Sequence, residues 1–361
     1  MEFNFYINNV DRKYLGLPEI QSNWEMRTLN NGEFIFLEGN NIVKFIEQKD
    51  TFYWEKSLNE TLSEDRIWLL PKTHKGKKTK LSSSTIMSKT PIGTYFCWTG
   101  DDVIIGNYTT QKTFYSTDLN NIIIKDVLEL REWLNTWVLN TTDILQKAIE
   151  IFSTEPREHI QFKEGDIFSI KYDRNLYGFG RVLLDVSKLR KQKKEKFSRF
   201  MGKPVLIKQF AYLSESNKID INTLDRCFSF PSIYIMDNVL YYGHYQIIGH
   251  KDLMEQDLDY PILYYRSNDA RNPNYINLNI GNIYKQINLS TNKYYGSFGQ
   301  HGIGFQTNID IDMIKKCIDN NSLSPYWSSK EYRYHASNDL RNPALKQIKE
   351  TILRQFDIIE Q

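Results

Sequence analysis

Short apolar segments separated by turn residues run along the chain as far as residue 119, and this pattern predicts β-strands. The turns at residues 30–32 (NNG) and 39–41 (GNN) are typical of hairpins, because Asn and Gly tolerate the positive φ that tight turns need. We therefore predict a β-rich N-terminal region. Its strand-like segments are FIFLEG at 34–39, NNIVKFIE at 40–47, TFYWEK at 51–56, IGTYFCWTG at 92–100 and DDVIIGNY at 101–108.

The hydrophobic period changes to that of a helix after Asn121. Asp126 stands early enough to suit the dipole of a first helix, and Thr141 or Thr142 can cap a second one that ends before Pro156. We interpret the two helices as a bridge between domains. The first apolar stripe consists of Val127, Leu130, Leu134, Trp137 and Val138, and the second of Leu145, Ala148, Ile149 and Phe152.

The chain is organised around residues 165–186 (GDIFSIKYDRNLYGFGRVLLDV), which predict a strand, a turn at 173–175 and a second strand. Gly178 and Gly180 flank Phe179, where a missing Cβ permits a bulge, a sharp coil or the close approach of another backbone. The alternative is a glycine loop that cradles a phosphate. No helix follows to offer its N-terminus to a phosphate, so we predict a structural role for both glycines.

Charge is distributed unevenly after this hairpin. Residues 188–203 (KLRKQKKEKFSRFMGK) contain eight cations and one acid, whereas residues 251–259 are acidic. The basic segment can be a mobile arm that orders against an acidic partner, or a solvated connection. The candidate partner-binding residues are Lys191, Lys193, Lys194 and Lys196 in the basic segment, and Asp252, Glu255, Asp257 and Asp259 in the acidic one.

Short strands bounded by turns resume at 204–213, 228–236 and 239–250, as expected of a strongly bent antiparallel sheet or a partly open barrel. Helical spacing returns at 309–318 and in a terminal stripe of Leu345, Ile348, Ile352, Phe356 and Ile359. These patterns predict an α+β fold. We expect a β-rich domain at 1–120, the helical bridge at 121–158, a second β-rich domain at 159–325 and a C-terminal helix within 326–361 that packs on the fold.

Composition supports a folded protein without pointing to a charged partner. Of the 361 residues, 40% are hydrophobic and 14% aromatic, which is ample for buried cores. Lys and Arg total 46 against 44 acids, so the net charge of +2 indicates neither a nucleic-acid partner nor a membrane surface. Three widely spaced cysteines and the lack of a signal-like or membrane-spanning apolar stretch favour a reducing cytoplasm.

Four stretches resemble the immunity protein 26 family: GDIF at 165–168, YGFGRV at 177–182, YGHYQIIGH at 242–250 and GIGFQTNIDIDMIKKCI at 302–318. The resemblance covers roughly residues 160 to 320. DRKYLGL at 11–17 and LPKTHKGKKTKL at 70–81 are similar to the N-terminal extension of longer members. The resemblance implies an antidote in a bacterial polymorphic toxin system, and some family members carry a phosphotriesterase label. We assign a structural role in these motifs to Gly165, Asp166, Phe168, Gly178, Phe179, Gly180, Gly249 and His250.

The sequence contains no recognisable catalytic set. His244 and His250 are the only close pair of histidines, and on one strand they would lie about 20 Å apart, too far to share a zinc ion. We expect His250 to hold a turn by hydrogen bonds to backbone. GxSxG, GxxxxGK[ST] and a GxGxxG before a helix are absent, so we expect no catalytic residue, metal or cofactor.

The leading hypothesis is therefore an intracellular antidote that occludes a cognate toxin. A metal-assisted hydrolase is the second hypothesis, because of the phosphotriesterase label, and a defence or regulatory protein associated with nucleic acid is the third. The sequence does not predict the oligomeric state.

Overall fold

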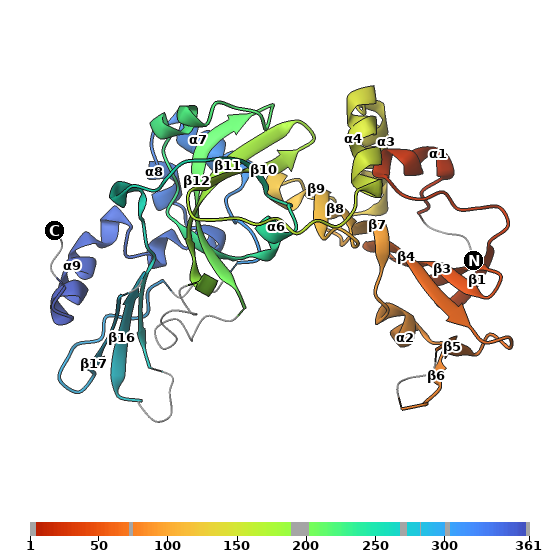
Figure 1. Cartoon of the computed structure of the whole chain (residues 1–361), viewed down its shortest axis with the longest axis horizontal. Helices are drawn as coiled ribbons and strands as arrows, with labels where there is room; N and C mark the ends of the chain where they lie inside the picture. The colour runs from red at the N-terminus through yellow and green to blue at the C-terminus, as the bar shows by residue number, and fades with distance from the viewer. Residues whose placement is uncertain are drawn as a thin grey trace. The chain divides into compact units, whose positions relative to one another are not determined.

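The computed structural model describes residues 5–71, 75–188, 202–267, 273–281, 283–299 and 304–358. The chain divides into two compact units, Met1–His159 and Ile160–Gln361. Both contain antiparallel sheets and helices, and none of the sheets formed by the described residues closes into a barrel, so the α+β class is confirmed (Figure 1). None of the helices in the described ranges is long and apolar enough to cross a membrane.

The N-terminal unit is built on one nine-stranded antiparallel sheet, in the order β1-β2-β3-β4-β7-β8-β9, with β5 and β6 continuing from β4. The predicted NNG and GNN turns connect β1 to β2 and β2 to β3, where the terminal pairs are Asn30 with Glu33 and Glu38 with Asn41. The strands are β1 Glu25–Asn30, β2 Glu33–Glu38, β3 Asn41–Lys49, β4 Phe52–Leu62, β5 Trp68–Leu70, β6 Thr79–Lys80, β7 Ile92–Trp98, β8 Val103–Asn107 and β9 Lys112–Ser116.

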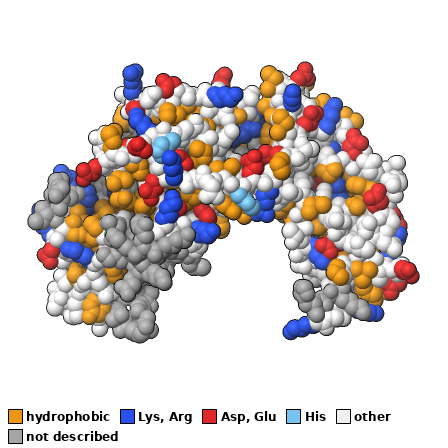
Figure 2. Space-filling model, viewed as in Figure 1, with side chains coloured by type: hydrophobic (Ala, Val, Ile, Leu, Met, Phe, Trp, Pro, Cys, Tyr) orange, Lys and Arg blue, Asp and Glu red, His pale blue; other side chains and the backbone are white. Residues whose placement is uncertain are grey.

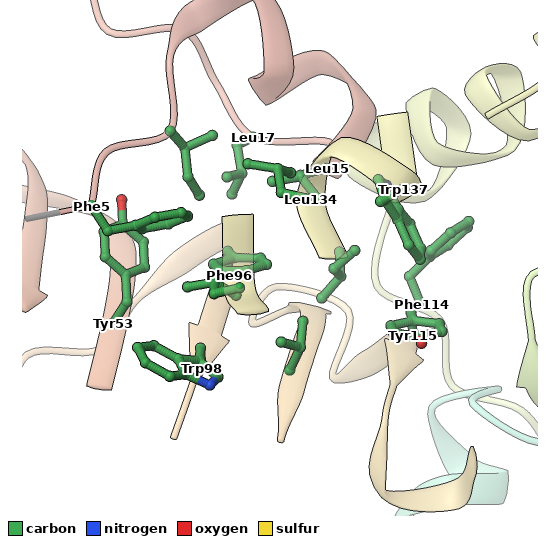
Figure 3. Packing of buried hydrophobic residues seen from close by; sticks show 14 of the residues in the cluster. Phe5, Leu15, Leu17, Tyr53, Phe96, Trp98, Phe114, Tyr115, Leu134 and Trp137 are labelled. Carbon is green, nitrogen blue, oxygen red and sulfur yellow. The ribbon is translucent and has the colours of Figure 1, made fainter. Parts of the chain in front are cut away.

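Helices α3 (Val127–Leu139) and α4 (Asp143–Thr154) share the main core of this unit with the sheet. Figure 3 shows Leu134 and Trp137 of α3 near Phe96 and Tyr115 of the strands. Thr142 caps α4, as one of the two predicted alternatives, because its side chain accepts a hydrogen bond from the first turn. Asp126, which we expected to suit the dipole of α3, also caps that helix by accepting hydrogen bonds from its first turn. The remaining helices are α1 Asn9–Arg12 and α2 Ser83–Met87, with 3₁₀ turns η1 Lys13–Leu15 and η2 Asp118–Asn120.

A fully buried charge cluster attaches α1 to the sheet. The Arg12 guanidinium donates to both Glu55 carboxylate oxygens at 2.8 and 2.9 Å, and Lys44 Nζ lies 2.8 Å from Glu55 Oε1. The Tyr53 hydroxyl donates to Glu55 Oε2 at 2.8 Å. Burial alone would raise the pKa of Glu55, but the charges of Lys44 and Arg12 and their hydrogen bonds outweigh it and hold this pKa at about 2.

The C-terminal unit contains two antiparallel sheets. The larger has the order β13-β12-β11-β10-β14, and the smaller has the order β15-β16-β17. Their strands are β10 Asp166–Asp173, β11 Leu176–Asp185, β12 Pro204–Ser214, β13 Ile233–Met236, β14 Gln246–His250, β15 Ile262–Arg266, β16 Tyr275–Ile280 and β17 Ile283–Asn288. The helical segments are η3 Ile221–Arg226, α6 Asn238–Tyr241, η4 Glu255–Asp257, α7 Ile311–Asp319, α8 Ser324–Trp327, η5 Tyr332–Tyr334, η6 Ala336–Asn338, η7 Pro343–Leu345 and α9 Lys346–Gln355.

The predicted hairpin is present as β10 and β11, joined where Asp173 pairs with Leu176. A Cβ on Gly178 would lie 2.6 Å from the Tyr172 ring, and one on Gly180 would lie 2.4 Å from the Phe168 ring. The pairing of β11 with β12 also shifts between the two glycines, which is a bulge. Both glycines therefore leave room for rings of the neighbouring strand to lie across β11.

Helix α9 packs on the smaller sheet as the terminal stripe predicts. Ile352 and Phe356 are buried against Tyr264 of β15 and Leu278 of β16, while Leu345 and Ile348 are partly buried at the edge of the same core. Leu353, which lies outside the predicted stripe, is buried with them. Ile359 lies outside the described residues.

Replacing Gly180 by Val should destabilise the C-terminal unit by about 1 to 3 kcal/mol, because the new side chain would meet the Phe168 ring and the Lys208 carbonyl oxygen, 2.8 Å from the Cβ position. Chemical denaturation monitored by fluorescence measures the loss. Gly39→Asn is the matched control, since no atom lies within 4 Å of a Cβ there and Asn tolerates positive φ. Equal stability of Gly180→Val and the wild type would contradict this packing.

Replacing Glu55 by Gln should destabilise the N-terminal unit by about 3 to 5 kcal/mol, because it leaves two buried cations without their counter-charge. The wild-type cluster also has a defined pH dependence. The pKa of Glu55 is lowered on folding, so its contribution is complete above the ordinary value of 4.5 and is lost as the pH falls towards about 2.

Urea denaturation of both proteins between these pH values measures the effect. The stability difference between wild type and Glu55→Gln should shrink as the pH falls. A difference that does not change with pH would show that Glu55 is not ionised in the folded protein.

Candidate partner-binding surface

Gly165 brings the start of β10 against the end of β14. Its φ is +90°, and a Cβ there would lie 2.5 Å from the Lys251 carbonyl oxygen and 2.9 Å from the His250 ring. The Lys251 N–H donates to the Gly165 carbonyl at 3.1 Å, so the two segments are joined at this corner. Gly249 is also closely covered, since its Cβ position is 3.1 Å from Ile221 in η3. Only a residue without a side chain fits at Gly165 without displacing backbone.

His250 lies between two carboxylates. Its Nδ1 is 2.7 Å from Asp166 Oδ1 and its Nε2 is 3.0 Å from Asp252 Oδ1. Asp166 is buried, and its other oxygen accepts the Lys163 N–H at 2.8 Å. The imidazole donates to both carboxylates only when both ring nitrogens carry protons. We expected His250 to bond backbone groups, but its partners are side chains. Asp166 lies 84 residues away in the sequence and gives no local signal, whereas Asp252 follows His250 by two residues.

Arg181 supports the backbone that follows β14. Its Nη2 donates to the carbonyl oxygens of Lys251 and Asp252 at 2.6 and 2.8 Å. Its Nη1 lies 3.1 Å from Asp257 Oδ2, and Lys208 Nζ lies 3.2 Å from Asp257 Oδ1. Both cations are nearly inaccessible, with 4% and 8% of their surfaces exposed. Side chains of two neighbouring strands of the larger sheet, β11 and β12, therefore anchor the segment 251–257.

Asp257 also makes a hydrogen bond within the segment 251–257. Its Oδ2 accepts the Met254 N–H at 2.9 Å, at the start of η4. Partial burial would raise the pKa of Asp257, but the Met254 hydrogen bond and the charges of Lys208 and Arg181 outweigh it and lower this pKa. Asp257 is thus an internal counter-charge rather than a free surface acid.

Asp259 is also engaged within the unit. Its Oδ2 accepts the Ser232 N–H at 2.8 Å and lies 2.9 Å from Nη1 of Arg341, which also pairs with Asp339 at 2.7 Å. Arg341 belongs to the SNDLRNP stretch at 337–343 and joins the C-terminal part of the chain to this segment.

The other two acidic candidates point outward. The Asp252 side chain is fully exposed apart from its contact with His250, and Glu255 is exposed on η4. Two apolar side chains accompany them, Met254 with 53% and Leu258 with 40% of its surface exposed. We call Asp252, Met254, Glu255 and Leu258 the loop surface. We did not select Met254 and Leu258 from the sequence. The sequence feature that could have indicated their exposure is their position as apolar residues within an acidic, turn-like stretch.

The described residues among the remaining candidates do not join this surface. Lys191, Lys193, Lys194 and Lys196 lie outside the described residues, as does His301. Phe168 stacks on Tyr245 with ring centres 5.3 Å apart, and Phe179 packs on Tyr212 at 5.6 Å, so both are core residues. His244 precedes β14 and stacks on Tyr245. Among the described residues no group of three or more His, Cys, Asp or Glu could hold a metal ion.

Residues 163–274 match the family model described as Immunity protein 26. The matched segment begins at Lys163, whose N–H donates to Asp166, and extends beyond β15. It includes Arg181, Lys208 and the whole loop surface. No curated protein and no solved structure matches the chain. An immunity protein family suggests a role in neutralising a toxin. The match falls on the region in which the sequence resembles this family: residues 163–274 are similar to immunity protein 26, and they are preceded by an N-terminal unit that is consistent with a long form of the family.

Proposed function

We propose that this protein binds one cognate toxin domain of a bacterial polymorphic toxin in the cytoplasm, and that it neutralises the toxin by occlusion through the loop surface. The observation that carries the proposal is the set of ion pairs and hydrogen bonds that anchor the backbone of the loop surface. Arg181 holds two consecutive carbonyl groups of the segment, and Asp257 is held by Arg181, Lys208 and the Met254 N–H.

This support means that the loop is ordered before a partner arrives. Ordering a flexible loop on binding costs free energy that reduces affinity, so a loop held by buried ion pairs and hydrogen bonds avoids most of that cost. The exposed side chains stand on the outer side of the same segment. The structure beneath the loop therefore suits a binding surface better than a simple connection between strands.

The chemistry of the loop surface indicates the kind of toxin surface that it fits. Asp252 and Glu255 attract a basic rim and steer the encounter, while Met254 and Leu258 offer apolar area for a pocket. Met is adaptable in shape, which suits an irregular contact. We propose a toxin face with lysines or arginines around an apolar depression.

Co-expression with a candidate toxin domain from a neighbouring gene tests the function itself. The wild-type protein should restore growth, and purified protein should bind the toxin in a stoichiometric complex. Growth inhibition that persists despite soluble, folded protein would overturn the assignment as an antidote of that toxin.

Reversing Asp252 and Glu255 to Lys should slow association with this toxin about tenfold and flatten its dependence on salt, because exposed charges act mainly on the rate of encounter. Stopped-flow or surface-plasmon kinetics at two salt concentrations measure the change. The double variant Asp319→Lys, Glu331→Lys changes net charge equally at exposed positions that do not belong to the loop surface and is the matched control. If both double variants behave alike, the loop surface is not the contact.

Replacing Met254 and Leu258 by Ser should instead accelerate dissociation about tenfold or more, because apolar contacts in an interface act mainly on the lifetime of the complex. Both side chains are substantially exposed, so the melting temperature of the free protein should stay close to that of the wild type. An unchanged dissociation rate would remove the apolar half of the proposed surface.

A further inference from the structure

Helix α4 has large apolar side chains on two of its sides. Leu145, Ile149 and Phe152 are buried in the core of the N-terminal unit. Ile144 and Ile151, in contrast, have 81% and 56% of their surfaces exposed. Hydrophobic side chains are visible at the surface in the region of this helix (Figure 2). A helix that packs on a core by one stripe needs only that stripe to be apolar, so the second pair requires a separate explanation.

The exposed pair is regularly spaced. Ile144 and Ile151 are seven residues apart, which places them on the same side of the helix, separated by two turns or about 10 Å. Lys147 and Glu150 lie exposed between them. We call Ile144, Lys147, Glu150 and Ile151 the α4 face. Leu139, at the end of α3 where the two helices connect, adds a side chain that is 85% exposed.

We propose that the α4 face binds the α4 face of a second copy of this chain in an antiparallel, two-fold symmetric contact. A two-fold interface requires a surface that is complementary to itself. Antiparallel alignment about the middle of the helix brings Ile144 against Ile151 of the partner subunit, and the reverse contact follows from the symmetry. The same alignment brings Lys147 within reach of Glu150 of the partner subunit, so apolar groups meet apolar groups and opposite charges meet.

The spacing favours a second copy over an unrelated partner. One helix carries the apolar pair and, between its members, one residue of each charge, so the same face supplies both the apolar and the oppositely charged halves of the contact. This surface belongs to the N-terminal unit, whereas the loop surface belongs to the C-terminal unit. The dimer is therefore independent of the toxin-binding proposal.

Disulfide cross-linking tests the register of the proposed contact in the full-length protein. The double variant Ile144→Cys, Ile151→Cys should form covalent dimers under mild oxidation, because each new thiol meets the other position on the partner helix. The two positions within one chain are about 10 Å apart, too far for an internal disulfide. Ile144→Cys alone is the matched control and should cross-link poorly, since its two copies are separated by the same distance. Equal cross-linking by the single and double variants would overturn the antiparallel register.

Sedimentation of the full-length protein over a range of concentrations tests the dimer itself. The wild type should dimerise, and Ile144→Glu should raise the dissociation constant of the dimer by about tenfold or more, because two carboxylates would then enter an apolar contact. Ile123→Glu places the same charge at an exposed isoleucine outside both helices and should dimerise as the wild type does. Circular dichroism confirms that each variant is folded. A wild type that remains monomeric throughout, or equal dimerisation by all three proteins, would overturn the proposal.

Discussion

The ion pairs between Asp257 and the two buried cations beneath it are the interaction on which the family-matched segment depends. Arg181 lies on β11 and Lys208 on β12, so the attraction for one carboxylate acts across two neighbouring strands. Buried charges are costly unless they are paired and hydrogen-bonded. Arg181 also donates hydrogen bonds to the carbonyl oxygens of Lys251 and Asp252 in the loop. Its ion pair and these hydrogen bonds together fix the path of the loop backbone.

The N-terminal unit also contains a buried carboxylate paired with two cations, and there the pairing attaches a helix to the sheet. Glu55 of β4 neutralises Arg12 and Lys44, and through Arg12 it attaches the short helix α1 to the sheet. A helix of four residues has little stability of its own, because it makes few internal hydrogen bonds. In both units, therefore, a segment that cannot order itself is held by a buried arginine paired with a carboxylate.

If the loop surface binds the toxin as proposed, this arrangement separates stability from recognition in the C-terminal unit. Asp257 and Asp259 neutralise cations inside the unit, whereas Asp252 and Glu255 stand outside with Met254 and Leu258. The outer residues can therefore vary with the partner without disturbing the loop, as long as the inner residues stay. A protein that recognises one toxin benefits from that separation, because its contact residues can change while the scaffold is preserved.

The sequence by itself determined the local elements. Period and turn chemistry predicted the NNG and GNN hairpins, the stripes of α3 and α4, the hairpin of β10 and β11, and the terminal helix, because each depends on residues close together in the chain. The family resemblance rested on similarly local motifs. Tertiary structure alone decided which acids face outward and that His250 contacts Asp166. Asp257 lies 76 residues from Arg181, and the carboxylate of Asp166 lies 84 residues from the imidazole of His250. Such pairs form only when strands of the folded sheet bring them together, so the spacing of charges along the chain does not reveal them.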